Sequence, residues 1–174
     1  QSICVGRDMR THSPSLTKAL IEGMNTAGAN VIDIGLIDTP QMYFAINHLG
    51  ACGGVQVTAS HNAAAYNGFK VSGQQAKPIG ADTGLKDIKH IATALLHTLG
   101  HPDGAVEHCD LTEEYKKHVL KFLDGKHRPI KVAVDASNGM AGKMAPIVFG
   151  DLDNVEMIGL NLKHDGTFKH DPNP

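Results

Sequence analysis

The hydrophobic positions in the first part of the chain fall into short runs that are separated by longer amphipathic segments. The runs at residues 2–5, 30–35, 53–57 and 69–72 are bounded by glycine or asparagine, and apolar runs bounded in this way predict buried strands. Strands that alternate with segments long enough for crossover helices can lie parallel in one sheet. The pattern therefore predicts an α/β fold.

The segments between these strands carry the signals of helices. Ser13-Pro14 and Thr39-Pro40 each pair an N-cap residue with a proline that suits the first helical position. Apolar residues recur every four positions in the first segment, as on one face of a helix. We expect this helix to end at Gly28 and the next one to be closed by Gly50. A third helix is expected over residues 80–99.

The order of elements starts again after a turn cluster at residues 101–104, which marks a domain edge. A helix is expected over residues 111–123, and then a strand, a helix and a strand at residues 130–134, up to about 150, and 155–159. The strand–helix–strand order of the first domain is thus repeated. We predict a three-layer α/β/α domain with a mixed sheet over residues 1–105, followed by a linker helix and the N-terminal part of an incomplete second α/β domain over residues 106–174.

An incomplete second domain has a consequence for association. Its sheet would expose an unpaired edge and an uncovered apolar face, which favours pairing between chains. Self-association through the second domain is therefore expected.

Composition and charge narrow the possible partners and the cell compartment. The formal net charge of −2 argues against a nucleic-acid partner, and no apolar run approaches the length that a bilayer crossing needs. The chain has three cysteines at wide spacing, and Cys4 and Cys52 lie in or beside apolar runs. We interpret them as buried reduced thiols, which is typical of a cytoplasmic protein.

The segment TASHNAAAYNGFKV at residues 58–71 follows the third predicted strand directly. Ligands bind beyond the carboxyl ends of strands in α/β sheets, so Ser60 is expected at a ligand-binding edge. The G-x-S-x-G pattern of serine hydrolases is absent, because Thr58 and Asn62 occupy its glycine positions. The side chain of the neighbouring His61 is also expected to point away from Ser60. An acyl-transfer role is therefore disfavoured.

Phosphoryl chemistry fits the same segment better. A phosphoserine carries about −1.5 to −2 charges at neutral pH, and it needs cations and oriented donors around it. Lys70 can supply an ammonium group, and the amides of a loop of small residues can form an anion-binding nest. His61 could donate to a phosphate oxygen or move a proton. Asn67-Gly68 is expected to form the tight turn that brings Lys70 back toward Ser60.

At these residues the chain resembles the α-D-phosphohexomutase family, in particular its phosphomannomutase/phosphoglucomutase branch. TASHN followed by YNGFK is similar to the phosphoserine loop of that family. VGRDMRTHSP, DTPQMYFA, VAVDASNGMAG and DGTFKHDPNP resemble successive other segments of the family, so the resemblance covers the whole chain in order.

The resemblance implies a four-domain enzyme, an intramolecular phosphotransferase. In this family a phosphoserine gives its phosphate to a hexose phosphate, and the other phosphate of the resulting bisphosphate returns to the serine. The phosphoryl group thereby moves between O1 and O6 of mannose or glucose. The implied partners are a hexose phosphate and a hexose bisphosphate, and the implied cofactor is Mg²⁺.

Site roles carry over to the matching residues. Ser60 would be the phosphoserine and, through its phosphate, a ligand of Mg²⁺. His61 and Lys70 would be catalytic groups at the phosphate, and Asn62 and Asn67 would bind phosphate. The aspartate-rich metal loop and the sugar-selecting domain of the family have no counterpart in the chain, so the isolated segment is expected to be inactive.

One departure from the family pattern and two alternatives belong beside this interpretation. Ala63 stands where the family usually has proline, which leaves the loop more mobile. A non-catalytic phosphosugar-binding or regulatory module is one alternative. A glucosamine-type mutase is the other, although that branch tends to carry isoleucine at the position of Phe69. Arg7 and Arg10 follow the first strand, and a structural salt bridge is favoured for them, for example between Arg7 and Asp8 or Asp38, over a contact with substrate.

Overall fold

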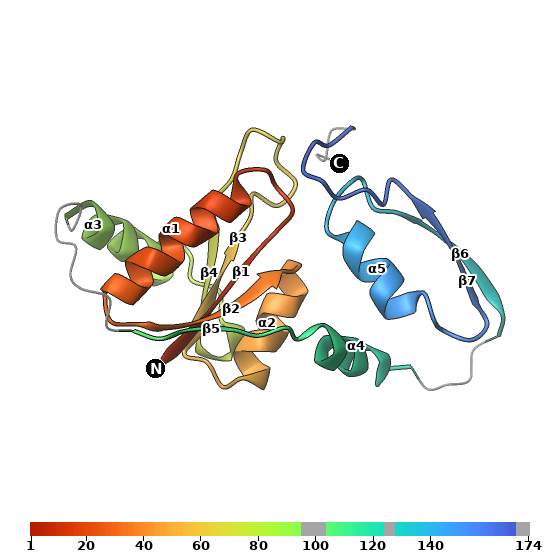
Figure 1. Cartoon of the computed structure of the whole chain (residues 1–174), viewed down its shortest axis with the longest axis horizontal. Helices are drawn as coiled ribbons and strands as arrows, with labels where there is room; N and C mark the ends of the chain where they lie inside the picture. Colours follow the sequence, from red (N-terminus) through yellow and green to blue (C-terminus); the bar gives the residue numbers. More distant parts are fainter. Residues whose placement is uncertain (95–103, 124–127, 170–174) are drawn as a thin grey trace. The chain divides into compact units, whose positions relative to one another are not determined.

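The computed structural model describes residues 1–94, 104–123 and 128–169 (Figure 1). Contacts divide the chain into two compact units. The first unit comprises Gln1–Asp8, His12–Thr58 and Gly68–Cys109, and the second comprises Met9–Thr11, Ala59–Asn67 and Asp110–Pro174. The boundary expected between residues 105 and 106 stays a prediction.

The first unit is built on a five-stranded sheet of order β4-β3-β1-β2-β5. Strands β1, β2, β3 and β5 are parallel to one another, and β4 runs antiparallel to β3, so the predicted mixed sheet is confirmed. The strands, in chain order, are β1 (Ser2–Arg7), β2 (Asn30–Leu36), β3 (Gly53–Val57), β4 (Phe69–Gly73) and β5 (Val106–His108).

Two crossover helices cover this sheet. Helix α1 (Ser13–Thr26) leads from β1 to β2, and α2 (Thr39–His48) leads from β2 back past β1 to β3. Because crossovers between parallel strands are right-handed, two crossovers in opposite directions carry their helices to opposite faces of the sheet, as Figure 1 shows. The three-layer α/β/α arrangement follows from this strand order.

The helix starts differ from the prediction by one residue. Helix α1 begins at Ser13 with His12 as the N-cap, and α2 begins at Thr39 with Asp38 as the N-cap. The Asp38 carboxylate accepts a hydrogen bond from the Gln41 amide at 2.9 Å, which is the bond expected of Thr39. Asp38 takes this position because its extended backbone directs the carboxylate at the first free amides of the helix.

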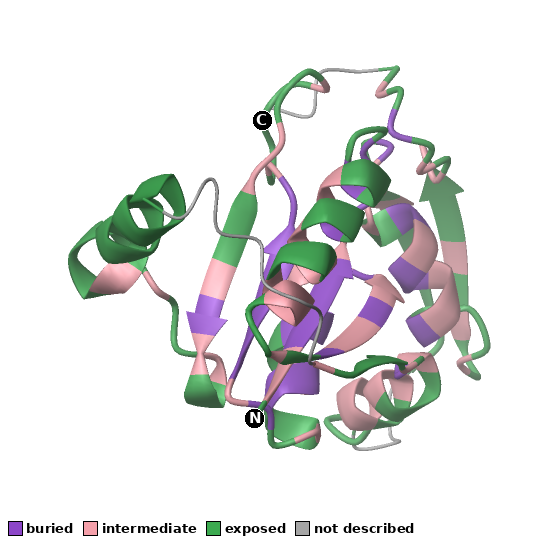
Figure 2. Cartoon of the chain, turned by 60° about the vertical axis from the view of Figure 1, so that its left-hand side comes forward, coloured by how far each residue is buried: buried purple, intermediate pink, exposed green. Residues whose placement is uncertain are grey.

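The core of the first unit lies between the central strands and α2. Figure 2 shows the buried residues gathered in the central strands, and Val5, Val57, Met42 and Ile46 are each at most 1% exposed. Gly54 allows the close contact, since a Cβ at this position would lie 2.6 Å from the Met42 sulfur. Gly54 therefore serves helix–sheet packing, whereas a Cβ at Gly53 would lie 2.6 Å from the Ser72 carbonyl oxygen in β4.

Cys4 lies in β1 with 0% of its surface exposed, and Cys52 and Cys109 are partly exposed; all are free thiols. Burial raises the pKa of the Cys4 thiol to about 11, with smaller contributions from Cys109 and Cys52. The thiol is therefore protonated and unreactive near neutral pH. The cytoplasmic location that the cysteines favour stays a prediction.

The segment after β4 departs most from the predicted elements. The expected helix over residues 80–99 is interrupted at its start, where Ala81–Leu85 forms a π-helical turn with Gly84 at φ +127° before α3 (Lys86–Ala94). A short 3₁₀ turn, Gln74–Ala76, precedes it. Residues 95–103, which include most of the expected turn cluster, lie outside the described residues. Strand β5 was not predicted.

The second unit repeats the βαβ arrangement. Strands β6 (Ile130–Asp135) and β7 (Val155–Leu160) pair in parallel, and α5 (Ala141–Phe149) connects them. Helix α4 (Thr112–Leu120) precedes them and contacts α5. Several apolar side chains of this sheet are exposed, among them Ile130, Ile158 and Leu160, and self-association stays a prediction. In the described parts of the chain, no helix combines the length and hydropathy that a bilayer crossing requires.

Candidate functional site

A buried carboxylate ties together the chain segments at the carboxyl end of β1. Asp8 is 4% exposed, and it accepts hydrogen bonds from Ser13 Oγ at 2.6 Å and from Thr58 Oγ1 at 2.7 Å. Its amide donates to the Val57 carbonyl at 3.0 Å. Asp8 thus joins the end of β1, the start of α1 and the end of β3. The Asp8 carboxylate accepts these two bonds and the Asp38 carboxylate caps α2, and the salt bridge suggested between one of them and Arg7 stays a prediction.

The loop that contains Ser60 starts directly after Thr58. Ser60 is exposed and has a φ of 56°, a left-handed conformation that is uncommon for residues other than glycine. Two turns shape the loop: the Asn62 amide donates to the Ala59 carbonyl at 3.1 Å, and the Tyr66 amide donates to the Ala63 carbonyl at 3.0 Å. The loop, which follows β3 in the chain, therefore presents the Ser60 side chain to solvent.

The expected tight turn at Asn67-Gly68 is not formed. The turn lies at residues 64–65, and the Thr58 amide donates to the Gly68 carbonyl at 2.9 Å. Gly68 thus extends the pairing of β3 with β4 by one step, which requires an extended backbone and not a turn.

Arg10 holds this loop from within. Its side chain is 1% exposed, and both terminal nitrogens of its guanidinium donate to backbone carbonyls. Nη1 donates to Ala63 at 2.8 Å and Tyr66 at 3.0 Å, and Nη2 donates to Ser60 at 2.9 Å and Asn62 at 2.6 Å. The salt bridge favoured from the sequence for Arg10 stays a prediction beside these carbonyl bonds. The sequence offers little signal for these bonds, because their partners are main-chain atoms about fifty residues away.

Ser60 and His61 are brought together. Ser60 Oγ lies 3.3 Å from His61 Nδ1, and both residues are exposed. The expectation that these neighbouring side chains point apart was wrong, because the left-handed backbone at Ser60 turns its side chain toward the following residue. The pair gives the serine oxygen an adjacent proton acceptor or donor.

The remaining predicted site residues lie at different places. Asn62 Nδ2 donates to the Ala59 carbonyl at 3.0 Å, within the loop. Asn67 is the last residue of the loop segment of the second unit and is partly exposed. Lys70 is the second residue of β4, paired with Gln56 in the sheet, and its side chain is exposed.

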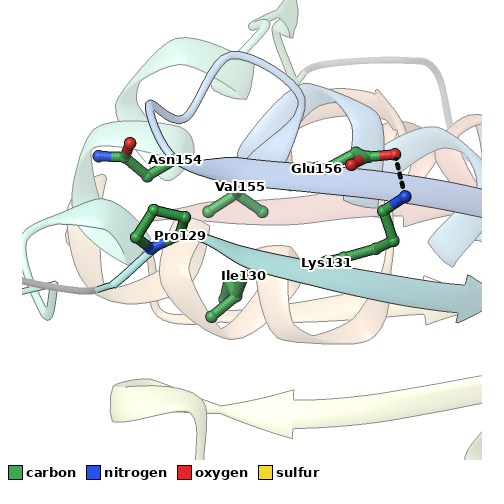
Figure 3. A pocket seen from close by; sticks show the side chains of 6 residues that line it. All are labelled: Pro129, Ile130, Lys131, Asn154, Val155 and Glu156. Carbon is green, nitrogen blue, oxygen red and sulfur yellow. Dashed lines mark ion pairs between the residues drawn. The ribbon is translucent and has the colours of Figure 1, made fainter.

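No group of three or more histidine, cysteine, aspartate or glutamate side chains suited to a metal ion occurs within residues 1–94, 104–123 and 128–169. An open hollow of about 430 Å³ lies at the start of β6 and β7 (Figure 3), where Lys131 pairs with Glu156 at 2.7 Å. This hollow is at the amino ends of parallel strands, opposite the edge at which α/β sheets bind ligands. It is therefore no candidate active site.

Known proteins match the chain along its full length. Residues 1–97 match the family model described as phosphoglucomutase/phosphomannomutase, alpha/beta/alpha domain I. A phosphomannomutase of Escherichia coli is 43% identical over 188 residues, covering 99% of this chain and 40% of that protein. A protein of Xanthomonas campestris pv. campestris named for phosphohexose mutases is 39% identical over 174 residues, covering 99% and 39%.

A solved structure agrees with the fold. The phosphoglucomutase/phosphomannomutase family protein of Burkholderia thailandensis has a TM-score of 0.84 at 32% identity, covering 98% of this chain and 38% of its own. The chain spans about two fifths of the length of the curated relatives cited above. These matches confirm the family indicated by the serine loop: the chain belongs to the phosphoglucomutase/phosphomannomutase family.

Proposed function

We propose that this protein moves a phosphoryl group between O1 and O6 of a hexose phosphate, mannose or glucose, with Ser60 as the residue that carries the group. The observation that supports this most is the exposed Ser60 hydroxyl, on a loop that follows β3 in the chain and that Arg10 bonds through four carbonyls. The names of the matched relatives, phosphomannomutase and phosphohexose mutase, support the substrate class.

The reaction takes two transfers that balance. In the first, the bond from Ser60 Oγ to phosphorus breaks, the O6 hydroxyl of a hexose 1-phosphate forms a new bond to phosphorus, and the hydroxyl proton is released to the leaving serine oxygen. In the second, Ser60 Oγ attacks the phosphorus on O1 of the resulting 1,6-bisphosphate, the bond from O1 to phosphorus breaks, the serine proton passes to O1, and the sugar leaves as the 6-phosphate. The serine is phosphorylated again at the end, so the protein returns to its starting state.

His61 is proposed to handle the serine proton. Nδ1 lies 3.3 Å from Ser60 Oγ, slightly beyond an ordinary hydrogen bond, and such catalytic contacts tighten in substrate complexes. Accepting the proton as Oγ attacks, and returning it as Oγ leaves, would make both directions of transfer possible through one side chain.

Lys70, Asn62 and Asn67 are proposed to stabilise the phosphate charge. The flexible stem of Lys70 carries a compact cation, which spreads the charge that develops on phosphoryl oxygens during transfer. An asparagine amide has two N–H donors. One donor of Asn62 bonds the Ala59 carbonyl, which leaves the second for a phosphate oxygen.

Mg²⁺ fits the described residues only in part. Hard oxygen ligands suit this ion, and the phosphate carried by Ser60 would supply one such ligand. The described ranges hold no cluster of three or more carboxylate, imidazole or thiolate groups that would complete the site. We therefore derive no step through the metal.

The proposal is tested by supplying the protein, as its gene encodes it, with three substrates: mannose 1-phosphate, glucose 1-phosphate and glucosamine 1-phosphate. Conversion of the first two to their 6-phosphates is expected, with a kcat in the range of about 1–10³ s⁻¹ and much slower conversion of the third. The proposal is contradicted if hexose phosphates bind but none is converted, which is the behaviour of a binding module. Preferred conversion of glucosamine 1-phosphate would contradict the sugar assignment.

A further inference from the structure

Arg10 is among the largest fully buried side chains in the described parts of the chain. Burial of a guanidinium is costly unless its N–H groups are hydrogen-bonded. Here both terminal nitrogens donate to carbonyls of one short loop, those of Ser60, Asn62, Ala63 and Tyr66. Such a set of acceptors converges only when the loop wraps around the guanidinium.

Most residues of this loop do not bury their side chains. Residues 61, 62, 63, 65 and 66 are exposed, and the one large side chain, Tyr66, is 64% exposed. Alanine side chains bury little apolar area, so packing contributes little to a single conformation. Ser60 is nevertheless in a left-handed conformation, which persists only where the surroundings over-determine it.

The other face of the guanidinium is covered from residues 166–168 of the same unit. The Phe168 ring centroid lies 5.0 Å from Arg10 Cζ, within the range of a cation–π contact. Gly166 permits the approach, since a Cβ there would lie 2.6 Å from the Met9 carbonyl oxygen. Arg10 is therefore enclosed between the serine loop and the segment before residue 169.

We propose that Arg10 is a positioning residue for Ser60: its four bonds to loop carbonyls set the left-handed turn that places the serine oxygen beside His61. This inference rests on the proposed function for its effect on phosphoryl transfer. Its effect on the loop conformation does not depend on that function.

Replacing Arg10 with lysine distinguishes the effect of the geometry of its donors from the effect of its positive charge. An arginine presents its donors in a rigid planar fork, whereas a lysine ammonium is a single point with three donors. Lysine keeps the positive charge but cannot reach carbonyls on two nitrogens at once. An electrostatic role of Arg10 would survive the change, and a positioning role would not.

The test uses Arg10→Lys and Arg10→Met in the protein as its gene encodes it, with Arg128→Met as the matched control on an exposed arginine. Amide hydrogen exchange is measured at Asn62 and Tyr66, whose amides close the two turns. Exchange at both is expected to rise about tenfold or more in the two Arg10 variants, because each lost bond to a charged donor is worth at least that factor. The control should match the unchanged protein.

Kinetics give the second readout. We expect kcat to fall about 100-fold in Arg10→Lys, because a displacement of the Ser60 oxygen by about 1 Å is enough to lower the rate by that factor. The KM for hexose phosphate should change less than about threefold. Thermal unfolding confirms that the lysine variant is folded. Unchanged loop exchange in this variant, or kcat restored by lysine, overturns the proposal. If exchange rises while Ser60→Ala keeps full activity, the positioning role stands and the proposed function fails.

Discussion

Replacing Ser60 with alanine is expected to reduce hexose phosphate interconversion by about four orders of magnitude or more, the scale at which loss of a covalent nucleophile is felt. Turnover is lost because alanine has no atom to carry the phosphoryl group. The oxygen that is removed, Ser60 Oγ, is exposed and lies 3.3 Å from His61 Nδ1. The loop fold should survive, since Arg10 bonds the backbone carbonyl of residue 60, which alanine keeps. The measurement is kcat with mannose 1-phosphate or glucose 1-phosphate.

Ser15→Ala is the matched control for this substitution. Ser15 is exposed, and its hydroxyl donates to the His12 carbonyl at 3.0 Å near the start of α1. Its loss removes an equivalent hydroxyl without touching the loop, so turnover should be unchanged. Turnover retained in Ser60→Ala would show that the phosphoryl group does not pass through this serine.

Replacing Asp8 with alanine is expected to lower the free energy of unfolding by about 3 kcal/mol, because a buried acceptor of two hydroxyl hydrogen bonds is removed and both donors are left without it. The loss is expected in the first unit, where Asp8 joins β1, α1 and the end of β3. Urea denaturation followed by circular dichroism measures it. Asp8→Asn should lower the free energy of unfolding less, since its amide oxygen can still accept a hydrogen bond from one of the two hydroxyls.

Asp87→Ala provides the control for this stability change. Asp87 is exposed in the first turn of α3, and surface substitutions of this kind stay within about 0.5 kcal/mol. If Asp8→Ala is no more destabilising than Asp87→Ala, the joining role assigned to Asp8 is wrong.

The sheet and its crossover helices could be predicted from the sequence because residues close together in the chain determine where these elements begin and end. The apolar runs at β1, β2, β3 and β4 have the lengths and glycine boundaries of strands, and helices of crossover length separate the first three. The antiparallel β4 follows a connection too short for a crossover helix. The family could be identified from TASHN and YNGFK because that loop is specific.

The features that the sequence did not reveal depend on contacts between distant segments. Strand β5, Val106–His108, has three residues, all of them exposed. It therefore lacks an apolar signal, and it is a strand only because it pairs with the edge of β2. Arg10 bonds main-chain oxygens, which any residue type supplies. The contact of Ser60 with His61 depends on the left-handed backbone conformation of Ser60. The residue pattern of the loop does not predict this conformation, since serine rarely adopts it.

The most direct test of the central claim follows one phosphoryl group. The protein, as encoded by its gene, is incubated with hexose 1,6-bisphosphate labelled in its phosphates, and the labelled peptide is then identified by mass spectrometry. The account predicts label on Ser60 that unlabelled hexose 1-phosphate removes within the time of a few turnovers. Label on another residue, or label on Ser60 that the sugar does not remove, would contradict it.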